Sequence, residues 1–128
     1  MGLFSSGTGR RSVAEHEARH VVVARHFGAT NLTAYVTPDG SRGYFTGDFD
    51  GTKEEEAIIL LAGGSRADMP GMRGVLPHGG DSDLKQAKRL LRGSGMSVRQ
   101  AEREAKKLVR KHRGAIKRET RKMEKRNR

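Results

Sequence analysis

The sequence contains no cysteine and no tryptophan, and its aromatic residues are only four Phe and two Tyr. Without cysteine the chain can form no disulfide, so its redox compartment cannot be inferred, and any metal site must use His and carboxylate ligands. The longest wholly apolar run, residues 57–62, is far too short to span a bilayer, and no charged-then-apolar signal sequence is present. We therefore expect a soluble, cytoplasmic protein without stable membrane insertion.

Acidic residues are scarce near the C-terminus, where the positive charge is concentrated. Residues 99–128 hold 14 of the 26 Lys and Arg but only four of the 15 acidic residues, a net charge of +10 out of +11 for the chain. This segment is either a solvated helix or a contact site for nucleic acid or an acidic partner. No aromatic residue follows Phe49, so any contact with nucleic acid would be to phosphate rather than by base stacking.

The most informative residues are His16, Glu17 and His20, which form the pattern H-E-x-x-H. Residues four apart share a helix face, so both imidazoles can reach one metal ion, while Glu17 approaches the water bound to that metal. This pattern on a helix is typical of zinc peptidases. The alternative is a helix with two hydrogen-bonded histidines and an ordinary surface glutamate.

The chain predicts a mainly α fold with a small β-sheet or hairpin. We expect a helix from Ser12, its cap, to Gly28, its stop, and two short strands around the turn at residues 38–40. Thr52 caps a second helix with an apolar core, and the pair Gly63-Gly64 indicates either a helix end or a close approach by a neighbouring element. A third helix ends near Leu91.

The expected organisation has three parts: a flexible leader (1–12), a zinc peptidase-like body (13–97) and a long basic helix (98–128). Residues 1–6 fit the loose myristoylation pattern, for which a flexible Gly/Ser leader is the alternative. A capping box at Ser97 opens the last helix, whose apolar stripe fades after Ile116. We expect its first half to pack on the body and its end to be frayed.

Several segments resemble, in order, the peptidase domain of the FtsH-type zinc proteases, the ATP-driven membrane proteases of bacteria and organelles. Val13–Ala24 is similar to the family's HEAGHAVVA helix. Four later segments also resemble the family. Gly43-Tyr44 matches a pair after its first strand and Ile59–Asp68 its LLAGRAAEE-like helix, while Gly79–Ala87 is similar to its GASNDLERA segment and Gly95–Ser97 to its YGMS. The resemblance implies a helical zincin-like metallopeptidase domain with bound Zn²⁺.

The resemblance also implies the third zinc ligand, which spacing alone does not select. Asp83 occupies the position of the family's ligand in the SND-like segment, and His78 and then Asp81 are the nearest competitors. Asp68 lies near a family glutamate and could accept the second ring N–H of a zinc-bound His, or instead pair with solvent or a neighbouring cation. Arg19 replaces the family's Gly and could bind a substrate carboxylate or point to solvent.

The resemblance thus predicts a freestanding metalloendopeptidase in which Glu17 is the catalytic base. No G-x-x-x-x-G-K-[ST] phosphate loop is present, so we expect ATP-independent cleavage of unfolded or flexible proteins, with the substrate added to the edge of strand Leu32–Val36. Such a domain would suit a bacterial or phage genome and could form a homo-oligomer. The alternative is a silent zincin-fold binding or structural protein of a larger assembly, such as a phage virion.

Overall fold

The computed structural model describes residues 2–63 and 79–126, with side chains for residues 11–63 and 83–125. The elements in these residues are α1 (Gly2–His26), β1 (Thr30–Val36), β2 (Gly43–Asp48), α2 (Lys53–Gly63), α3 (Gly79–Leu91), α4 (Val98–Lys111) and α5 (Arg113–Arg126). The prediction of a mainly α fold with a small β hairpin is confirmed. None of the described helices is both long and apolar enough to cross a membrane.

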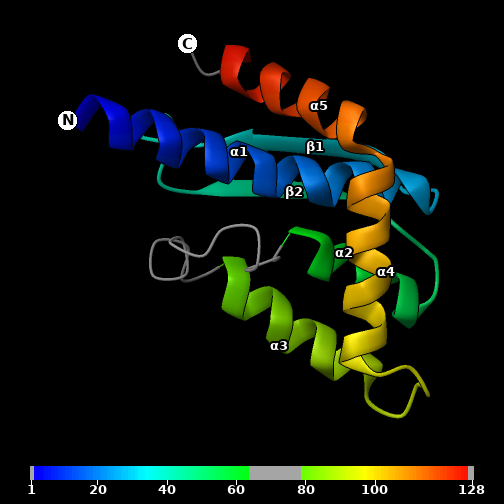
Figure 1. The fold of residues 1–128 in the computed structure, drawn as a ribbon. Helices are drawn as coiled ribbons and strands as arrows, with labels where there is room; N and C mark the ends of the chain where they lie inside the picture. Colours follow the sequence, from blue (N-terminus) through cyan, green and yellow to red (C-terminus); the bar gives the residue numbers. More distant parts are fainter. Residues whose placement is uncertain (1, 64–78, 127–128) are drawn as a thin grey trace.

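Strands β1 and β2 form an antiparallel hairpin around the predicted turn. The N–H of Thr37 donates to the carbonyl of Arg42 at 2.8 Å, and Gly40 adopts a positive φ of 75°. Alternate side chains of β1 lie on opposite faces, so Ala34 and Val36 are buried while Tyr35 is exposed. The buried face of the hairpin lies against α1 (Figure 1).

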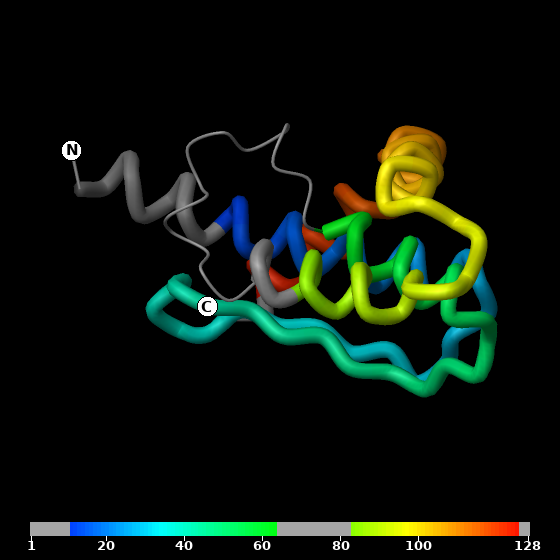
Figure 2. The backbone as a smooth tube through the Cα atoms, turned by 90° about the horizontal axis from the view of Figure 1, so that it is seen from below, coloured from blue at the N-terminus to red at the C-terminus, as the bar shows by residue number. Residues whose placement is uncertain are grey.

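Helix α1 is the central element of the fold. It packs against the hairpin, α2 and α5, and α2 in turn packs against α3 and α4. Figure 1 shows α5 running alongside α1, with α4 descending steeply from it, and Figure 2 shows the hairpin along one side of the helices. Because neighbours surround α1, its second half is buried on most sides rather than along one stripe.

The buried apolar residues form two clusters, and α1 contributes to both. The first surrounds α2 and includes Val23, Ile58, Ile59, Leu91, Ala101, Ala105 and Leu108. The second lies between α1, β1 and α5 and includes Val13, Ala18, Val22, Val36, Ile116 and Met123. The motif on α1 therefore lies between two packed regions.

The predicted end of α1 is confirmed, but its predicted start is wrong. The N–H of Ala29 donates to the carbonyl of Ala24 and that of Gly28 to Arg25, each at 3.0 Å, which is a Schellman motif around a glycine with φ of 90°. The helix begins at Gly2, however, so residues 2–12 of the expected flexible leader are helical. No proline interrupts this stretch, and Arg11 pairs with Glu124 of α5 at 3.7 Å.

The predicted long C-terminal helix is two helices that meet at His112. The capping box at Ser97 is confirmed, and α4 buries Ala101, Ala105 and Leu108 in the first cluster. Helix α5 buries Ile116 and Met123 in the second cluster and runs to Arg126, while the fraying of its end stays a prediction. The bend at His112 places α4 against the first cluster and α5 against the second.

Candidate metal centre

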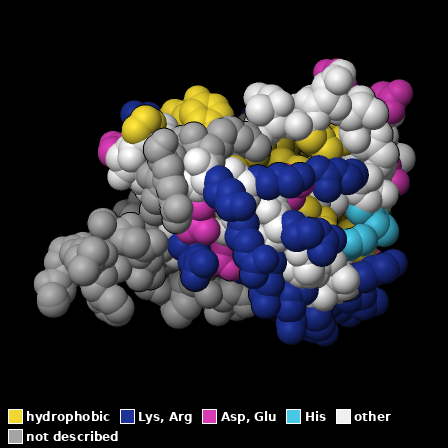
Figure 3. Space-filling model, turned by 90° about the horizontal axis from the view of Figure 1, so that it is seen from above, with side chains coloured by type: hydrophobic (Ala, Val, Ile, Leu, Met, Phe, Trp, Pro, Cys, Tyr) yellow, Lys and Arg dark blue, Asp and Glu magenta, His cyan; other side chains and the backbone are white. Residues whose placement is uncertain are grey.

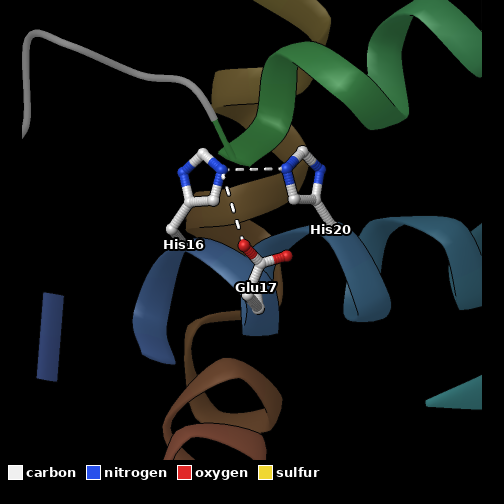
Figure 4. A group of neighbouring side chains, drawn as sticks. All are labelled: His16, Glu17 and His20. Carbon is white, nitrogen blue, oxygen red and sulfur yellow. Dashed lines mark hydrogen bonds and ion pairs between the residues drawn. The ribbon is translucent and has the colours of Figure 1, made fainter. Parts of the chain in front are cut away.

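Helix α1 holds His16 and His20 on one side, with their Nε2 atoms directed at the same point, as the spacing predicted. Their Nε2 atoms are 3.2 Å apart, and the two residues are only 4% and 1% exposed (Figure 4). Two imidazole nitrogens that converge in a buried position are a recurrent feature of metal sites. With Glu17 they form a group whose potential ligand atoms lie within 4.8 Å of one another.

Asp83 on α3 supplies a third atom at the same point. Its Oδ2 lies 3.1 Å from the Nε2 of His20 and 3.5 Å from the Nε2 of His16. Ligands bound to zinc at 2.0–2.1 Å in tetrahedral geometry are separated from one another by about 3.3 Å. The triangle of two nitrogens and one oxygen, with sides of 3.2, 3.1 and 3.5 Å, therefore matches one face of a zinc coordination tetrahedron.

A hydrogen bond at Nδ1, the ring nitrogen of His20 that points away from the triangle, fixes the tautomer of this residue. Its Nδ1 lies 2.9 Å from the carbonyl oxygen of Ile59 on α2, and because a carbonyl only accepts, Nδ1 carries the proton. In the neutral ring Nε2 carries a lone pair, which faces the Asp83 carboxylate and the Nε2 of His16. A positive charge among these atoms, either a proton on a ring nitrogen or a metal ion at the centre of the triangle, stabilises the arrangement, so the residues fit a bound metal ion.

Glycines and an aromatic ring shape the surroundings of the two histidines. A Cβ built on Gly63 would collide with the Nε2 of His20, so the predicted close approach at this glycine is confirmed. The ring of Phe45 on β2 stacks on the His20 ring, with centroids 4.4 Å apart and planes 11° from parallel. These contacts hold the imidazole in one orientation.

Glu17 lies beside the triangle rather than in it. Its Oε2 is 3.9 Å from the Nε2 of His16, and the side chain is buried under β2, where a Cβ on Gly43 would lie 2.7 Å from its Cγ. The pKa of Glu17 is raised to about 7, chiefly by burial; His16 opposes this shift and Asp83 adds to it. A carboxyl group with this pKa can take up and release a proton near neutral pH.

The pKa of Asp83 is shifted in the opposite direction, which would suit an anionic metal ligand. Burial works against its ionisation, but the contacts with His16 and His20 outweigh burial and lower the pKa of this carboxyl below its usual value of 3.8. The pKa values of two neighbouring carboxyl groups are thus shifted apart: Asp83 stays ionised, whereas Glu17 can exchange its proton near neutral pH. This pattern is found in catalytic sites.

Other predicted residues are tested only in part. Arg19 is half-buried, and its contact with a substrate carboxylate or with solvent stays a prediction. His78 and Asp68 lie outside the described residues, as does the side chain of Asp81. The Nδ1 of His16 is buried and has no hydrogen-bond partner within the described part of the chain. The hydrogen bond from a histidine ring N–H to the Asp68 carboxylate therefore stays a prediction.

The sequence did not indicate the roles of the Ile59 carbonyl and the Phe45 ring. A backbone carbonyl has no sequence signal, and Phe45 was assigned only to a strand. The structure brings both to His20 through the packing of α2 and the hairpin on α1.

Comparison of the chain with protein-family models, curated proteins and solved structures finds no significant match. The function must therefore be argued from the geometry and chemistry of the site itself.

Proposed function

We propose that the chain is a zinc-dependent endopeptidase related to the FtsH-type peptidase domains. The observation that carries this proposal is the triangle of His16 Nε2, His20 Nε2 and Asp83 Oδ2, whose sides of 3.1–3.5 Å suit three ligands of one tetrahedral zinc. Three protein ligands leave the fourth position for water, which is the arrangement of catalytic rather than structural zinc sites.

Glu17 is the general base and acid of the proposed reaction. Bound zinc would polarise the scissile carbonyl and acidify a water molecule. The Glu17 carboxylate takes the proton of that water as it attacks the carbonyl carbon, and then gives the proton to the leaving amine as the C–N bond breaks. In the metal-free protein the pKa of Glu17 is raised to about 7, and a bound zinc ion would lower it towards the ionised form that accepts the proton of the water.

The substrate of this reaction is an extended peptide segment, and its place is at β2 rather than at the predicted edge of β1. β1 contacts α5, whereas Figure 1 shows β2 on the side of the hairpin away from α5. β2 also carries Gly43 and Phe45, which contact Glu17 and His20. Addition of an extended chain to the edge of β2 that does not pair with β1 would bring its backbone towards the site.

The test compares wild type with Glu17→Gln, which keeps the size of the side chain and removes its proton transfer. We expect both proteins to bind zinc and to give the same circular dichroism spectrum. Cleavage of fluorescently labelled, unfolded casein should fall by roughly 10²–10⁴-fold in the variant, because general acid–base catalysis contributes about this much.

Glu15→Gln is the matched control, since Glu15 lies on the same helix and has no described contact with the triangle. It should cleave at the wild-type rate. A wild type that binds zinc but shows no cleavage dependent on Glu17 would refute the enzyme and favour a zincin-fold binding protein.

A further inference from the structure

The acidic residues of α5 are turned towards α1 and neutralised there. Glu119 pairs with Arg25 at 3.3 Å and Glu124 pairs with Arg11 at 3.7 Å, and their side chains are only 15% and 26% exposed. The fold therefore separates the charges of α5. The face that packs on α1 holds the carboxylates, and the opposite face holds the cations.

The outward face of α5 carries Arg118, Arg121 and Lys125, which are three and four positions apart and therefore form one stripe. All three are exposed, and within the described residues none of them forms an ion pair. α4 carries a matching stripe of exposed cations: Arg99, Arg103, Lys106 and Arg110. Figure 3 shows Lys and Arg side chains covering much of the face seen from above, on the side of α5.

We propose that these two stripes, the basic face of α4 and α5, bind double-stranded nucleic acid through its phosphates, without sequence preference. A duplex carries one negative charge per about 1.7 Å of its axis, so a row of unpaired cations on two successive helices can contact several phosphates at once. Contacts of this kind fix position and affinity but read no bases.

The surroundings of the basic face favour a duplex over a membrane surface or a single strand. The apolar residues of α4 and α5, including Leu108, Ile116 and Met123, are buried in the body and cannot enter a lipid layer. The exposed large hydrophobic residues in the described chain are Tyr35 and Tyr44, which lie on the hairpin. Neither helix contains an aromatic residue on which single-stranded bases could stack.

The proposal is tested by fluorescence anisotropy with a labelled 30-base-pair DNA duplex of arbitrary sequence, over a series of salt concentrations. The triple variant Arg118→Gln, Arg121→Gln, Lys125→Gln should bind about tenfold or more weakly at moderate salt. The slope of log affinity against log salt should decrease in magnitude by about 2–3, because each lost phosphate contact removes about 0.9. A second duplex of different sequence should give the same values.

The matched control removes the same charge elsewhere, with Lys88→Gln and Arg89→Gln in the last turn of α3 and Arg92→Gln directly after it; all three side chains are exposed. It should bind DNA nearly as wild type does. Equal weakening by both triple variants would overturn the proposal, because net charge and not the basic face would then account for binding. Absence of DNA binding by wild type at low salt, or binding only to phosphatidylserine vesicles, would overturn it as well.

The outcome of the DNA-binding experiment does not depend on whether the protein is a zinc peptidase. Both triple variants should keep the zinc content of wild type, since the altered side chains lie away from His16, His20 and Asp83. If DNA binding depends on the basic face while the protein holds no zinc, only the proposed peptidase function fails.

Discussion

At the scale of single residues, His20 joins three elements at one point. α1 carries the residue, α2 fixes its tautomer through the carbonyl of Ile59, and α3 presents Asp83 to its Nε2. The orientation of the ring is thus set by folding. A metal ion would find this ligand already oriented, which reduces the conformational entropy lost on binding.

Gly63 tests whether this packing matters for the site. Gly63→Ala places a methyl group against the Nε2 of His20, so the ring must move away from His16 and Asp83. Overpacking of this kind costs about 1–3 kcal/mol, and we expect zinc affinity to fall by roughly 10- to 100-fold in a chelator competition assay.

Gly114→Ala is the control for that substitution. Gly114 lies in α5, where a Cβ would meet only the end of the flexible Arg118 side chain at 3.6 Å. Zinc affinity should be unchanged, and the protein should become more stable by up to about 1 kcal/mol, because alanine favours helix more than glycine does. Equal zinc affinity of all three proteins would show that the close contact at Gly63 does not constrain the site.

Glu17 gives the metal-free protein a characteristic pH dependence. Its pKa is raised from 4.5 to about 7 by burial, so the folded state favours the protonated carboxyl group. Protonated Glu17 therefore adds to the free energy of unfolding, fully below pH 4.5, and this contribution is lost as the pH rises to about 7. In Glu17→Gln this loss is absent, and the difference in unfolding free energy between the two proteins should change by about 3 kcal/mol across this range.

The measurement is urea denaturation at several pH values in the presence of a chelator. Parallel stability curves for wild type and Glu17→Gln between pH 4.5 and 7 would contradict a buried Glu17 with a raised pKa.

At the scale of elements, local signals in the sequence predicted those boundaries that local chemistry determines. The glycine stop of α1, the turn at residues 38–40, the cap at Thr52 and the capping box at Ser97 depend on residues a few positions apart. The bend at His112 depends instead on two separate core clusters, which no local pattern reveals. The start of α1 at Gly2 was missed because Ser12 and Glu15 resemble a capping box.

Met123 tests whether α5 is part of the fold rather than an appendage. Its side chain is 1% exposed and packs in the cluster shared by α1, β1 and α5. Met123→Ala should lower the unfolding free energy by about 2–4 kcal/mol, measured by urea denaturation, because it leaves a cavity in this cluster. Lys125→Ala, two positions away on the exposed face, should change stability by less than about 0.5 kcal/mol. Similar small effects of both substitutions would mean that α5 contributes little to stability.

At the scale of the whole molecule, the candidate site lies where three parts of the chain meet. The spacing of His16, Glu17 and His20 was sufficient to predict their common position, because four residues make about one helical turn. Asp83 is 63 positions from His20, and only the resemblance to a protease family selected it. The fold places the predicted carboxylate beside both imidazoles, while the binding of a metal ion there remains a proposal.

The most direct test of the central claim is zinc affinity, measured by competition with a chromophoric chelator and checked by elemental analysis. We predict about one zinc per wild-type chain. His16→Ala and His20→Ala should each lose it. Asp83→Ala should weaken binding by more than the roughly 10- to 100-fold typical of groups outside the ligand set, whereas Asp81→Ala should bind as wild type does. Zinc affinity unchanged in Asp83→Ala, or full zinc retained by both histidine variants, would contradict a metal centre built from His16, His20 and Asp83.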